Sequence, residues 1–164
     1  MTFQRIVSLY GYRKLLTYIA VQKVLGINRH VPWPVHWSSV IKAPEKIDRG
    51  TRTPGLSPWV YLDGRNGIIF GKNVWVGPGV KIISMNHDVT HYPDYIAEEP
   101  IEIGENCWLG ADALIMAGVK LGNHVVVGAG SVVTKSFLED DVLIAGNPAV
   151  VKKKLPPYQM AGQP

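Results

Sequence analysis

Cysteine is almost absent from this sequence, because Cys107 is the single one among 164 residues. One cysteine excludes an intrachain disulfide framework and a zinc cluster built from cysteines, and it fits a reducing compartment. Charged residues are also few, at 18% of the chain against 46% hydrophobic residues, which excludes a disordered acidic protein. No apolar stretch approaches the ~20 residues that a membrane crossing needs, and we recognise no secretory signal. We therefore expect a soluble globular domain in the cytoplasm.

Acidic residues are missing from the N-terminal part of the chain, since no Asp or Glu precedes Glu45. The basic residues of this part are Arg5, Arg13, Lys14, Lys23, Arg29 and Lys42. The apolar residues Leu9, Tyr12, Leu16 and Ile19 recur at steps of three and four, which predicts a helix over about 3–25. We prefer a docking helix with a solvated basic face, and a peripheral contact with an anionic membrane is the alternative. We expect no nucleic-acid partner.

Proline interrupts the next part of the chain, at Pro32, Pro34, Pro44, Pro54 and Pro58. Proline cannot donate to a hydrogen-bond ladder, so we expect an extended linker and irregular first turns here. The sequence then divides into an N-terminal helix and irregular extended segment over 1–58, a main domain over 59–150 and a basic tail over 151–164.

A six-residue repeat dominates the main domain. Aliphatic residues stand six positions apart at Ile103, Leu109, Ile115, Leu121, Val127 and Val133, and upstream Phe70, Val76 and Ile82 keep the same step. A second aliphatic or small position runs two residues earlier, at Ile68, Val74, Val80, Ile101, Cys107, Ala113, Val119, Val125 and Ser131. Glycine follows many of the first set.

This period excludes a long helix, because at 3.6 residues per turn a stripe with period six drifts around the helix. A hexapeptide unit instead indicates a parallel β-helix, in which each unit supplies one short strand with its aliphatic residue pointing inward. Three units close a triangular coil of 18 residues, so 70–82, 103–115 and 121–133 are predicted to form three regular coils. The period alone does not determine the handedness.

The repeat breaks once, between Ile82 and Ile103, which are 21 positions apart. We interpret this as one coil plus three residues. The segment is polar and aromatic and contains Pro93, so it predicts a loop over about 84–100 that leaves the scaffold. Long loops on regular scaffolds are where function usually lies.

Several runs resemble a known family. They are Asn86-His87-Asp88, Ile103-Gly104-Glu105-Asn106-Cys107-Trp108-Leu109-Gly110-Ala111, Gly128-Ala129-Gly130-Ser131-Val132-Val133-Thr134-Lys135 and Ala145-Gly146-Asn147-Pro148-Ala149. Together they are similar to the hexapeptide-repeat acyltransferases, in particular to the galactoside and maltose O-acetyltransferases and their polysaccharide-modifying relatives. The similarity covers about 68–154, and the first sixty-odd residues show no match.

The resemblance implies a left-handed parallel β-helix, although left-handed crossovers are otherwise rare. It also implies a homotrimer and transfer of an acetyl group from acetyl-CoA to a hydroxyl of a sugar or polysaccharide unit. His87 is then the general base, because a histidine has a pKa suited to this work at neutral pH. We expect a carboxylate to orient its ring, and Asp88, Glu98 and Glu99 remain open choices.

The resemblance also assigns the binding residues. The pantetheine arm of CoA is expected at Ala111 and Ala129, and its nucleotide end at Thr134, Lys135 and Lys153. Substrate contacts are expected from Asn86, Asp88, Asp63 and Trp108, with Trp108 near the acetyl end of the donor. Asp63 has a second interpretation as a corner residue before Gly64. Where the family often has a basic residue after the Pro-Ala pair, this chain has Val150, which shifts phosphate binding to Lys152, Lys153 and Lys154.

Other interpretations remain open. Cys107 falls on the inward stripe, so we expect a buried thiol and no acyl-cysteine intermediate. An N-acetyltransferase of an amino sugar, amino acid or antibiotic would use the same histidine. A non-catalytic scaffold or a metal-binding β-helix is the alternative of another class. His87, His91 and His124 are its candidate ligands, but His124 is far from the other two in sequence. We expect no metal.

Overall fold

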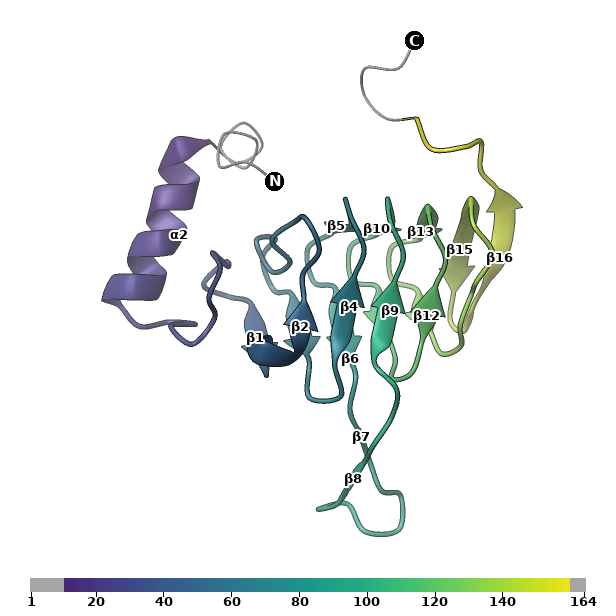
Figure 1. Cartoon of the computed structure of the whole chain (residues 1–164), viewed down its shortest axis with the longest axis horizontal. Coiled ribbons are helices and arrows are strands. Elements are labelled where there is room, and N and C mark those ends of the chain that lie inside the picture. The colour runs from purple at the N-terminus through teal and green to yellow at the C-terminus, as the bar shows by residue number, and fades with distance from the viewer. Residues whose placement is uncertain (1–10, 160–164) are drawn as a thin grey trace.

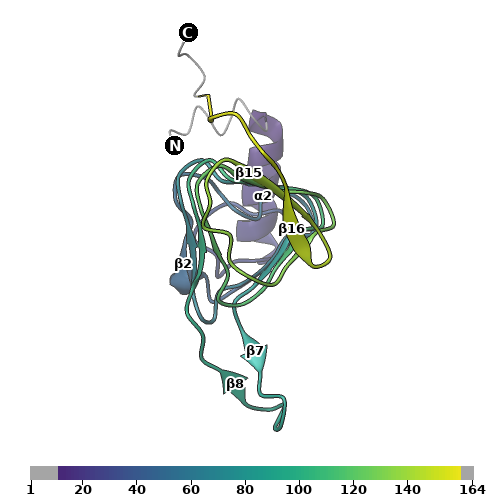
Figure 2. The ribbon, with the colours of Figure 1, turned by 90° about the vertical axis from the view of Figure 1, so that its right-hand side faces the viewer.

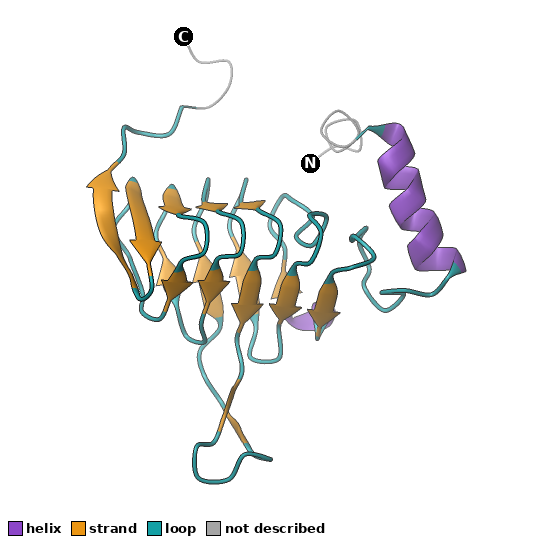
Figure 3. Ribbon diagram, turned by 180° about the vertical axis from the view of Figure 1, so that it is seen from behind, coloured by secondary structure: helices purple, strands orange, loops and turns teal. Residues whose placement is uncertain are grey.

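Short parallel strands arranged in three sheets make up most of the molecule in the computed structural model, which describes residues 11–159. Sheet A contains β1 (Val40–Lys42), β3 (Tyr61–Asp63), β6 (Lys81–Ile83), β11 (Leu114–Ile115) and β14 (Val132–Val133). Sheet B contains β2 (Ile47–Asp48), β4 (Ile68–Phe70), β9 (Ile101–Ile103) and β12 (Lys120–Leu121). Sheet C contains β5 (Trp75–Val76), β10 (Trp108–Leu109), β13 (Val125–Val127), β15 (Val142–Gly146) and β16 (Ala149–Lys154). The chain visits A, B and C in turn, so the strands lie in rows along the stack (Figures 1 and 3).

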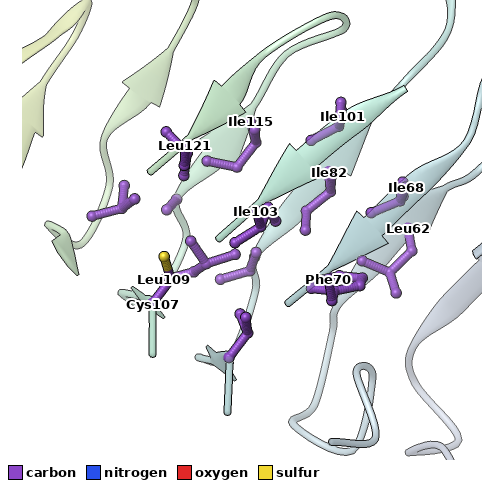
Figure 4. Close-up of a cluster of buried hydrophobic side chains, with 14 of the residues drawn as sticks. Leu62, Ile68, Phe70, Ile82, Ile101, Ile103, Cys107, Leu109, Ile115 and Leu121 are labelled. Carbon is purple, nitrogen blue, oxygen red and sulfur yellow. The ribbon is translucent and has the colours of Figure 1, made fainter. Parts of the chain in front are cut away.

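The strand register confirms the predicted coils. Leu109 lies beside Val127, and Ile115 lies beside Val133, which are steps of 18 residues. Seen along the stack, the coils superpose around a closed interior (Figure 2). Every member of both predicted stripes from 68 to 133 is buried except Val76, which is partly buried. Figure 4 shows part of this core, with Ile68, Ile82, Ile101 and Ile115 among the side chains that pack between the sheets.

The solenoid begins earlier than the sequence analysis placed it. β1 pairs with β3 and β2 pairs with β4, so the sheets start at Val40 and not near residue 59. Ile41 pairs with Leu62, and Leu62 with Ile82, at steps of 21 and 20 residues. These longer steps hide the first coils from a search for period six.

The interpretation of 82–103 as one coil plus three residues is wrong. Ile82 and Ile103 face the interior on adjacent sheets of one coil, where the regular step is six residues. The 15 additional residues form the excursion, which contains the antiparallel pair β7 (Asn86–His87) and β8 (Tyr95–Ile96). This hairpin projects from the corner between sheets A and B (Figures 1 and 2).

The N-terminal helix, α2 (Tyr12–Val24), buries a different face from the predicted one. Of the predicted face, Leu16 is 55% exposed and Ile19 is partly buried, whereas Leu15, Tyr18 and Gln22 are buried. The Gln22 side chain donates to the carbonyl oxygens of Asn28, Val31 and Trp33, and the Tyr18 ring meets the rings of His36 and Trp37. The helix is apolar on several sides, so its docking partners decide which side is buried. Leu9, Arg5 and the side chain of Tyr12 lie outside the described parts of the chain.

The C-terminal end is a strand pair where a basic tail was expected to begin. β16 runs antiparallel to β15, and its Lys152, Lys153 and Lys154 are exposed. Residues 155–159 continue along the corner between sheets B and C, where the nitrogen of Leu155 donates to the carbonyl oxygen of Asp141. Within residues 11–159, no helix is both long and apolar enough to span a bilayer.

Candidate active site

The hairpin presents His87 on its surface. The imidazole Nδ1 lies 2.5 Å from the carbonyl oxygen of Tyr92. A carbonyl only accepts hydrogen bonds, so a neutral His87 carries its proton on Nδ1 and leaves the lone pair on Nε2. The ring also packs against that of Tyr95, with centroids 4.6 Å apart. The side chain is therefore oriented and exposed, as a base acting on an external substrate requires.

Two of the three carboxylates expected to orient His87, those of Asp88 and Glu98, have other hydrogen-bond partners. Asp88 Oδ1 accepts from the nitrogen and hydroxyl of Thr90 and from the nitrogen of His91. The Thr90 side-chain and backbone hydrogen bonds hold the pKa of Asp88 below its ordinary value. Glu98 accepts from the amide of Asn86 at 3.0 Å. The expectation of an orienting carboxylate is wrong, because the carbonyl of Tyr92 occupies the position proposed for Asp88, Glu98 or Glu99.

Asp63 is 1% exposed and lies at the base of the hairpin. Its Oδ1 accepts from Nε of Arg65 at 2.8 Å and its Oδ2 from Nη2 of Arg65 at 2.7 Å. Burial alone would raise the pKa of Asp63, but the hydrogen bonds from Arg65 hold it below the ordinary value. Both carboxylate oxygens are thus engaged within the protein, which favours the corner interpretation of Asp63 over the sugar contact.

The predicted donor-binding residues lie on two corners of the solenoid. Ala111 and Ala129 stack at the corner between sheets C and A, where the nitrogen of Gly130 donates to the carbonyl oxygen of Ala111. The turn at Gly146 continues this column, because its nitrogen donates to the hydroxyl of Ser131. A Cβ on Gly110 would lie 2.7 Å from the nitrogen of Ala129, so the corner backbones are in close contact.

Thr134 and Lys135 are exposed at the other border of sheet A, on the same corner as the hairpin. They follow β14, whereas the hairpin follows β6 two coils earlier in sheet A. Lys153 is exposed on β16, beside Leu143 of β15. The structure therefore does not gather the five predicted CoA contacts at one place within a single chain.

Trp108 lies on the outer face of sheet C, and Trp75 is its neighbour on β5. The two indoles are 56% and 41% exposed. They border a hollow of about 420 Å³, which is further lined by Asn106, His124, Val126 and Tyr158. Tyr158 packs on His124 at 5.1 Å between centroids, and its hydroxyl accepts from the amide of Asn73. Trp108 therefore points outward from the solenoid and is open to solvent.

Cys107 is fully buried, and its thiol lies 3.2 Å from the carbonyl oxygen of Gly122. Burial raises the pKa of Cys107 to about 11. A thiol that stays protonated and inaccessible is a poor nucleophile, so it does not act as an acyl carrier. Among residues 11–159, no three His, Cys, Asp or Glu side chains come together in a way that would hold a metal ion. His91 pairs with Asp94 and His124 with Asp141.

Arg65, Asn66 and Tyr95 join the hairpin to the preceding coil, a role that the sequence did not predict for them. The amide of Asn66 donates to the carbonyl oxygens of Ser84 and Ile96, and the Arg65 guanidinium lies over the Tyr95 ring. One signal was available: Arg65 and Asn66 stand about one coil before the start of the excursion, at the same corner.

The chain thus combines triangular coils of hexapeptide units with one excursion that carries a histidine. Residues 100–135 match the family model described as the hexapeptide repeat of succinyl-transferase. The resemblance to the hexapeptide-repeat acyltransferases is thereby confirmed.

Particular relatives extend this similarity. The chain is 39% identical over 93 residues to the galactoside O-acetyltransferase of Lactococcus lactis subsp. lactis (strain IL1403). This alignment covers 54% of this chain and 44% of that protein. It is 35% identical over 104 residues to an Escherichia coli (strain K12) protein provisionally named colanic acid biosynthesis acetyltransferase WcaF, covering 51% and 57% of the two chains. The chain spans about half the length of the curated relatives it matches.

The structural similarity covers more of the chain than the sequence similarity does. The hexapeptide-repeat acetyltransferase VCA0836 of Vibrio cholerae O1 biovar eltor, solved in complex with acetyl coenzyme A, superposes with a TM-score of 0.62. The superposition covers 94% of this chain and 89% of that one at 22% identity. The predicted left-handed parallel β-helix is confirmed.

Proposed function

We propose that this chain is an acetyl-CoA-dependent O-acetyltransferase that acts on a hydroxyl of a sugar or polysaccharide unit. The observation that carries the proposal is the exposed His87, whose Nδ1 is engaged by the Tyr92 carbonyl. The lone pair on Nε2 is thereby available to an incoming hydroxyl. The names of the relatives, which include a galactoside and a colanic acid acetyltransferase, support both the reaction and the substrate class.

The reaction follows from this arrangement by direct transfer. His87 Nε2 takes the hydroxyl proton as the acceptor oxygen forms a bond to the carbonyl carbon of the thioester. The tetrahedral intermediate then collapses, the carbon–sulfur bond breaks, and the imidazolium returns its proton to the leaving thiolate. The products are an acetyl ester and free CoA. The Tyr92 carbonyl stabilises the imidazolium, because Nδ1 keeps its hydrogen bond throughout.

The donor is assigned to the two borders of sheet A and to β16. The small side chains of Ala111 and Ala129 allow a narrow pantetheine chain to approach the backbone of the corner. We assign the nucleotide phosphates to Lys135 and Lys153, since exposed ammonium groups bind phosphate as point charges. Thr134 adds a hydroxyl beside Lys135. Lys154 is paired with Glu139 and is the less available of the terminal lysines.

A homotrimer would bring these parts together. The corner that carries Ala111 and Ala129 and the corner that carries the hairpin lie on opposite borders of sheet A in one chain. A threefold arrangement with sheet A facing the axis would place the hairpin of one subunit against the donor corner of the next. The site would then be complete only in the assembly.

We assign the acceptor to the surface around His87 and to Trp108 of the partner subunit, since Trp108 lies on the outer face of sheet C, away from the hairpin of its own chain. Asn86 and Asp88 flank the histidine, and Asp88 is ionised at neutral pH. The exposed indole of Trp108 offers an apolar face of the kind that packs against sugar rings. Asp63 has no place in this surface, because Arg65 engages both of its oxygens.

The test is a thiol-release assay with acetyl-CoA and a panel of hydroxyl and amino acceptors, with products identified by mass spectrometry. We expect ester formation on one or more sugars and a loss of about 10²- to 10⁴-fold in kcat in His87→Gln. His91→Gln is the matched control, because His91 is exposed on the same hairpin and its ring pairs with Asp94. Amide products would support an N-acetyltransferase instead, and release that is insensitive to His87→Gln would refute the proposed base.

A further inference from the structure

The corner formed by residues 63–66 lies between β3 and β4, directly beside the base of the hairpin. It contacts both legs of the excursion. The backbone carbonyl of Asp63 accepts from the nitrogen and the hydroxyl of Ser84 on the outgoing leg. The amide of Asn66 donates to Ser84 at 2.8 Å and to Ile96 on the returning leg at 3.1 Å. The hairpin therefore leaves the solenoid in a direction set by this corner.

Arg65 has the longest side chain of the corner, and its guanidinium is fixed by the buried carboxylate of Asp63. Nε and Nη2 form a parallel two-point contact with the carboxylate of Asp63, at 2.8 and 2.7 Å. Asp63 is 1% exposed, and the Arg65 side chain is 31% exposed. Two-point contacts of this kind fix the plane of a guanidinium as well as its position. Hydrogen bonding to Asp63, with a further contribution from Tyr95, raises the pKa of Arg65, so its charge is permanent.

The fixed guanidinium lies over the ring of Tyr95, with its central carbon 4.7 Å from the ring centroid. Tyr95 is in turn the strand partner of His87, and the two rings are 4.6 Å apart. Tyr95 is 53% exposed and His87 is exposed, so burial does not hold these rings. A continuous series of contacts thus runs from a buried carboxylate through Arg65 and Tyr95 to the imidazole.

We propose that Arg65, held by Asp63, is a positioning residue that sets the orientation of His87 through the ring of Tyr95. The proposal rests on the proposed function, in which His87 is the base. Arg65 touches no reacting atom. Its role is to keep the exposed imidazole in the one orientation from which Nε2 meets the acceptor, and displacements of about 1 Å at a reacting group cost roughly 10²-fold in rate.

The test compares Arg65→Lys, which keeps the charge but loses the planar fork, with Tyr95→Leu, which removes the ring and leaves the buried ion pair intact. Tyr95→Phe keeps the ring, and Arg49→Lys makes the same exchange at an exposed arginine near the neighbouring corner. Steady-state kinetics give kcat and KM for acetyl-CoA. Long-range nitrogen–proton NMR of histidine-labelled protein reports the tautomer of His87, which is assigned with His87→Gln.

We expect Arg65→Lys and Tyr95→Leu to lower kcat about tenfold to hundredfold, with KM for acetyl-CoA within roughly twofold of the unmodified value. Both should mix the two tautomers of His87, whereas Arg49→Lys should leave kcat and the nitrogen shifts unchanged. Tyr95→Phe keeps the ring but loses the hydroxyl that contributes to the raised pKa of Arg65, so it should lower kcat less than Tyr95→Leu does. If Arg65→Lys does not fold, Tyr95→Leu decides alone.

Unchanged kcat and unchanged His87 nitrogen shifts in the folded variants would overturn the proposal. So would a lower kcat without any change at the His87 nitrogens, since Arg65 would then act by another route. Failure of the proposed function has a different signature, because the unmodified protein would release no more thiol than His87→Gln. The nitrogen shifts would still decide whether Arg65 positions the ring.

Discussion

The coils and the hairpin are stabilised in opposite ways. In the coils, the inward side chains from Ile68 to Val133 are almost completely buried, and each strand pairs with its equivalents in neighbouring coils. In the hairpin, residues 89–97 are all exposed, and polar contacts to the corner 63–66 determine its direction. The coils therefore supply the stability, whereas the proposed function places the base on the hairpin, so mutations should separate the two properties.

Excision of the hairpin is expected to have the largest effect. Deleting residues 85–99 restores a six-residue step between Ile82 and Ile103. Pro100 should also be changed to Gly, because Gly118 at the equivalent corner has φ +69°, which proline cannot adopt. We expect acetyl transfer to vanish, while the free energy of unfolding in urea stays within about 1 kcal/mol. An unfolded product, or one that still transfers acetyl groups, would contradict the separation.

A cavity in the coils should lower the free energy of unfolding, which excision of the hairpin leaves nearly unchanged. Ile115 is fully buried between Ile82 and Val133, so Ile115→Ala should lower the free energy of unfolding by about 2–5 kcal/mol. Val89, at the hairpin tip, is 80% exposed, so Val89→Ala should change the free energy of unfolding by less than about 0.5 kcal/mol. Urea unfolding of both variants measures the contrast. Equal losses would mean that the hairpin shares in the core.

The corners offer a finer comparison between two glycines. A Cβ on Gly104 would lie 2.3 Å from the backbone oxygen of Gly122, so Gly104→Ala must push two coils apart, at a cost of about 3 kcal/mol. Gly130 has open space around it but a φ of +65°, so Gly130→Ala should cost only about 1 kcal/mol. Thermal and urea unfolding should rank the two variants in this order, and the opposite ranking would show that neighbouring coils separate easily.

The coils could be predicted from the sequence because each hexad is a local signal. The step of six predicts which residues face inward, and its single interruption predicts where the excursion leaves. The contacts of the excursion are not local in this sense. Asp63 and Arg65 read as an ordinary turn around Gly64, and only the stacking of coils brings Arg65 to Tyr95. The group that orients His87 is the backbone carbonyl of Tyr92. Every residue has such a carbonyl, so residue types alone could not predict this contact.

The first coils and the helix face were missed for a related reason. Steps of 21 and 20 residues between Ile41, Leu62 and Ile82 do not repeat, so no period exists to detect. In α2, apolar side chains occur on more than one side, and the buried side is the one whose Gln22 can bond to free carbonyls in the loop that follows. Tertiary contacts decided both features.

The smallest expected effect is the loss of stability at acidic pH that is caused by His36, in the segment between α2 and β1. His36 is 8% exposed, and burial lowers its pKa below the ordinary 6.5. The folded segment therefore takes up a proton less readily than the unfolded one, so stability is full above pH 6.5 and falls as the pH drops from there toward the lowered pKa. We expect the thermal midpoint of the natural protein to drop about 2 °C more between pH 7.5 and pH 5 than that of His36→Gln. Parallel curves for the two proteins would rule out a role of His36.

The reversed direction of β16 limits how these molecules can assemble. A stack of parallel coils could in principle continue from one molecule to the next and grow into a filament. Here the last strand presents an antiparallel partner and three consecutive cations, Lys152–Lys154, to any newcomer. A second copy arriving head to tail would meet a mismatched pairing pattern and like charge, which are two recognised barriers to strand addition. Along sheet C, β16 thus disfavours head-to-tail continuation of the solenoid from one molecule to the next.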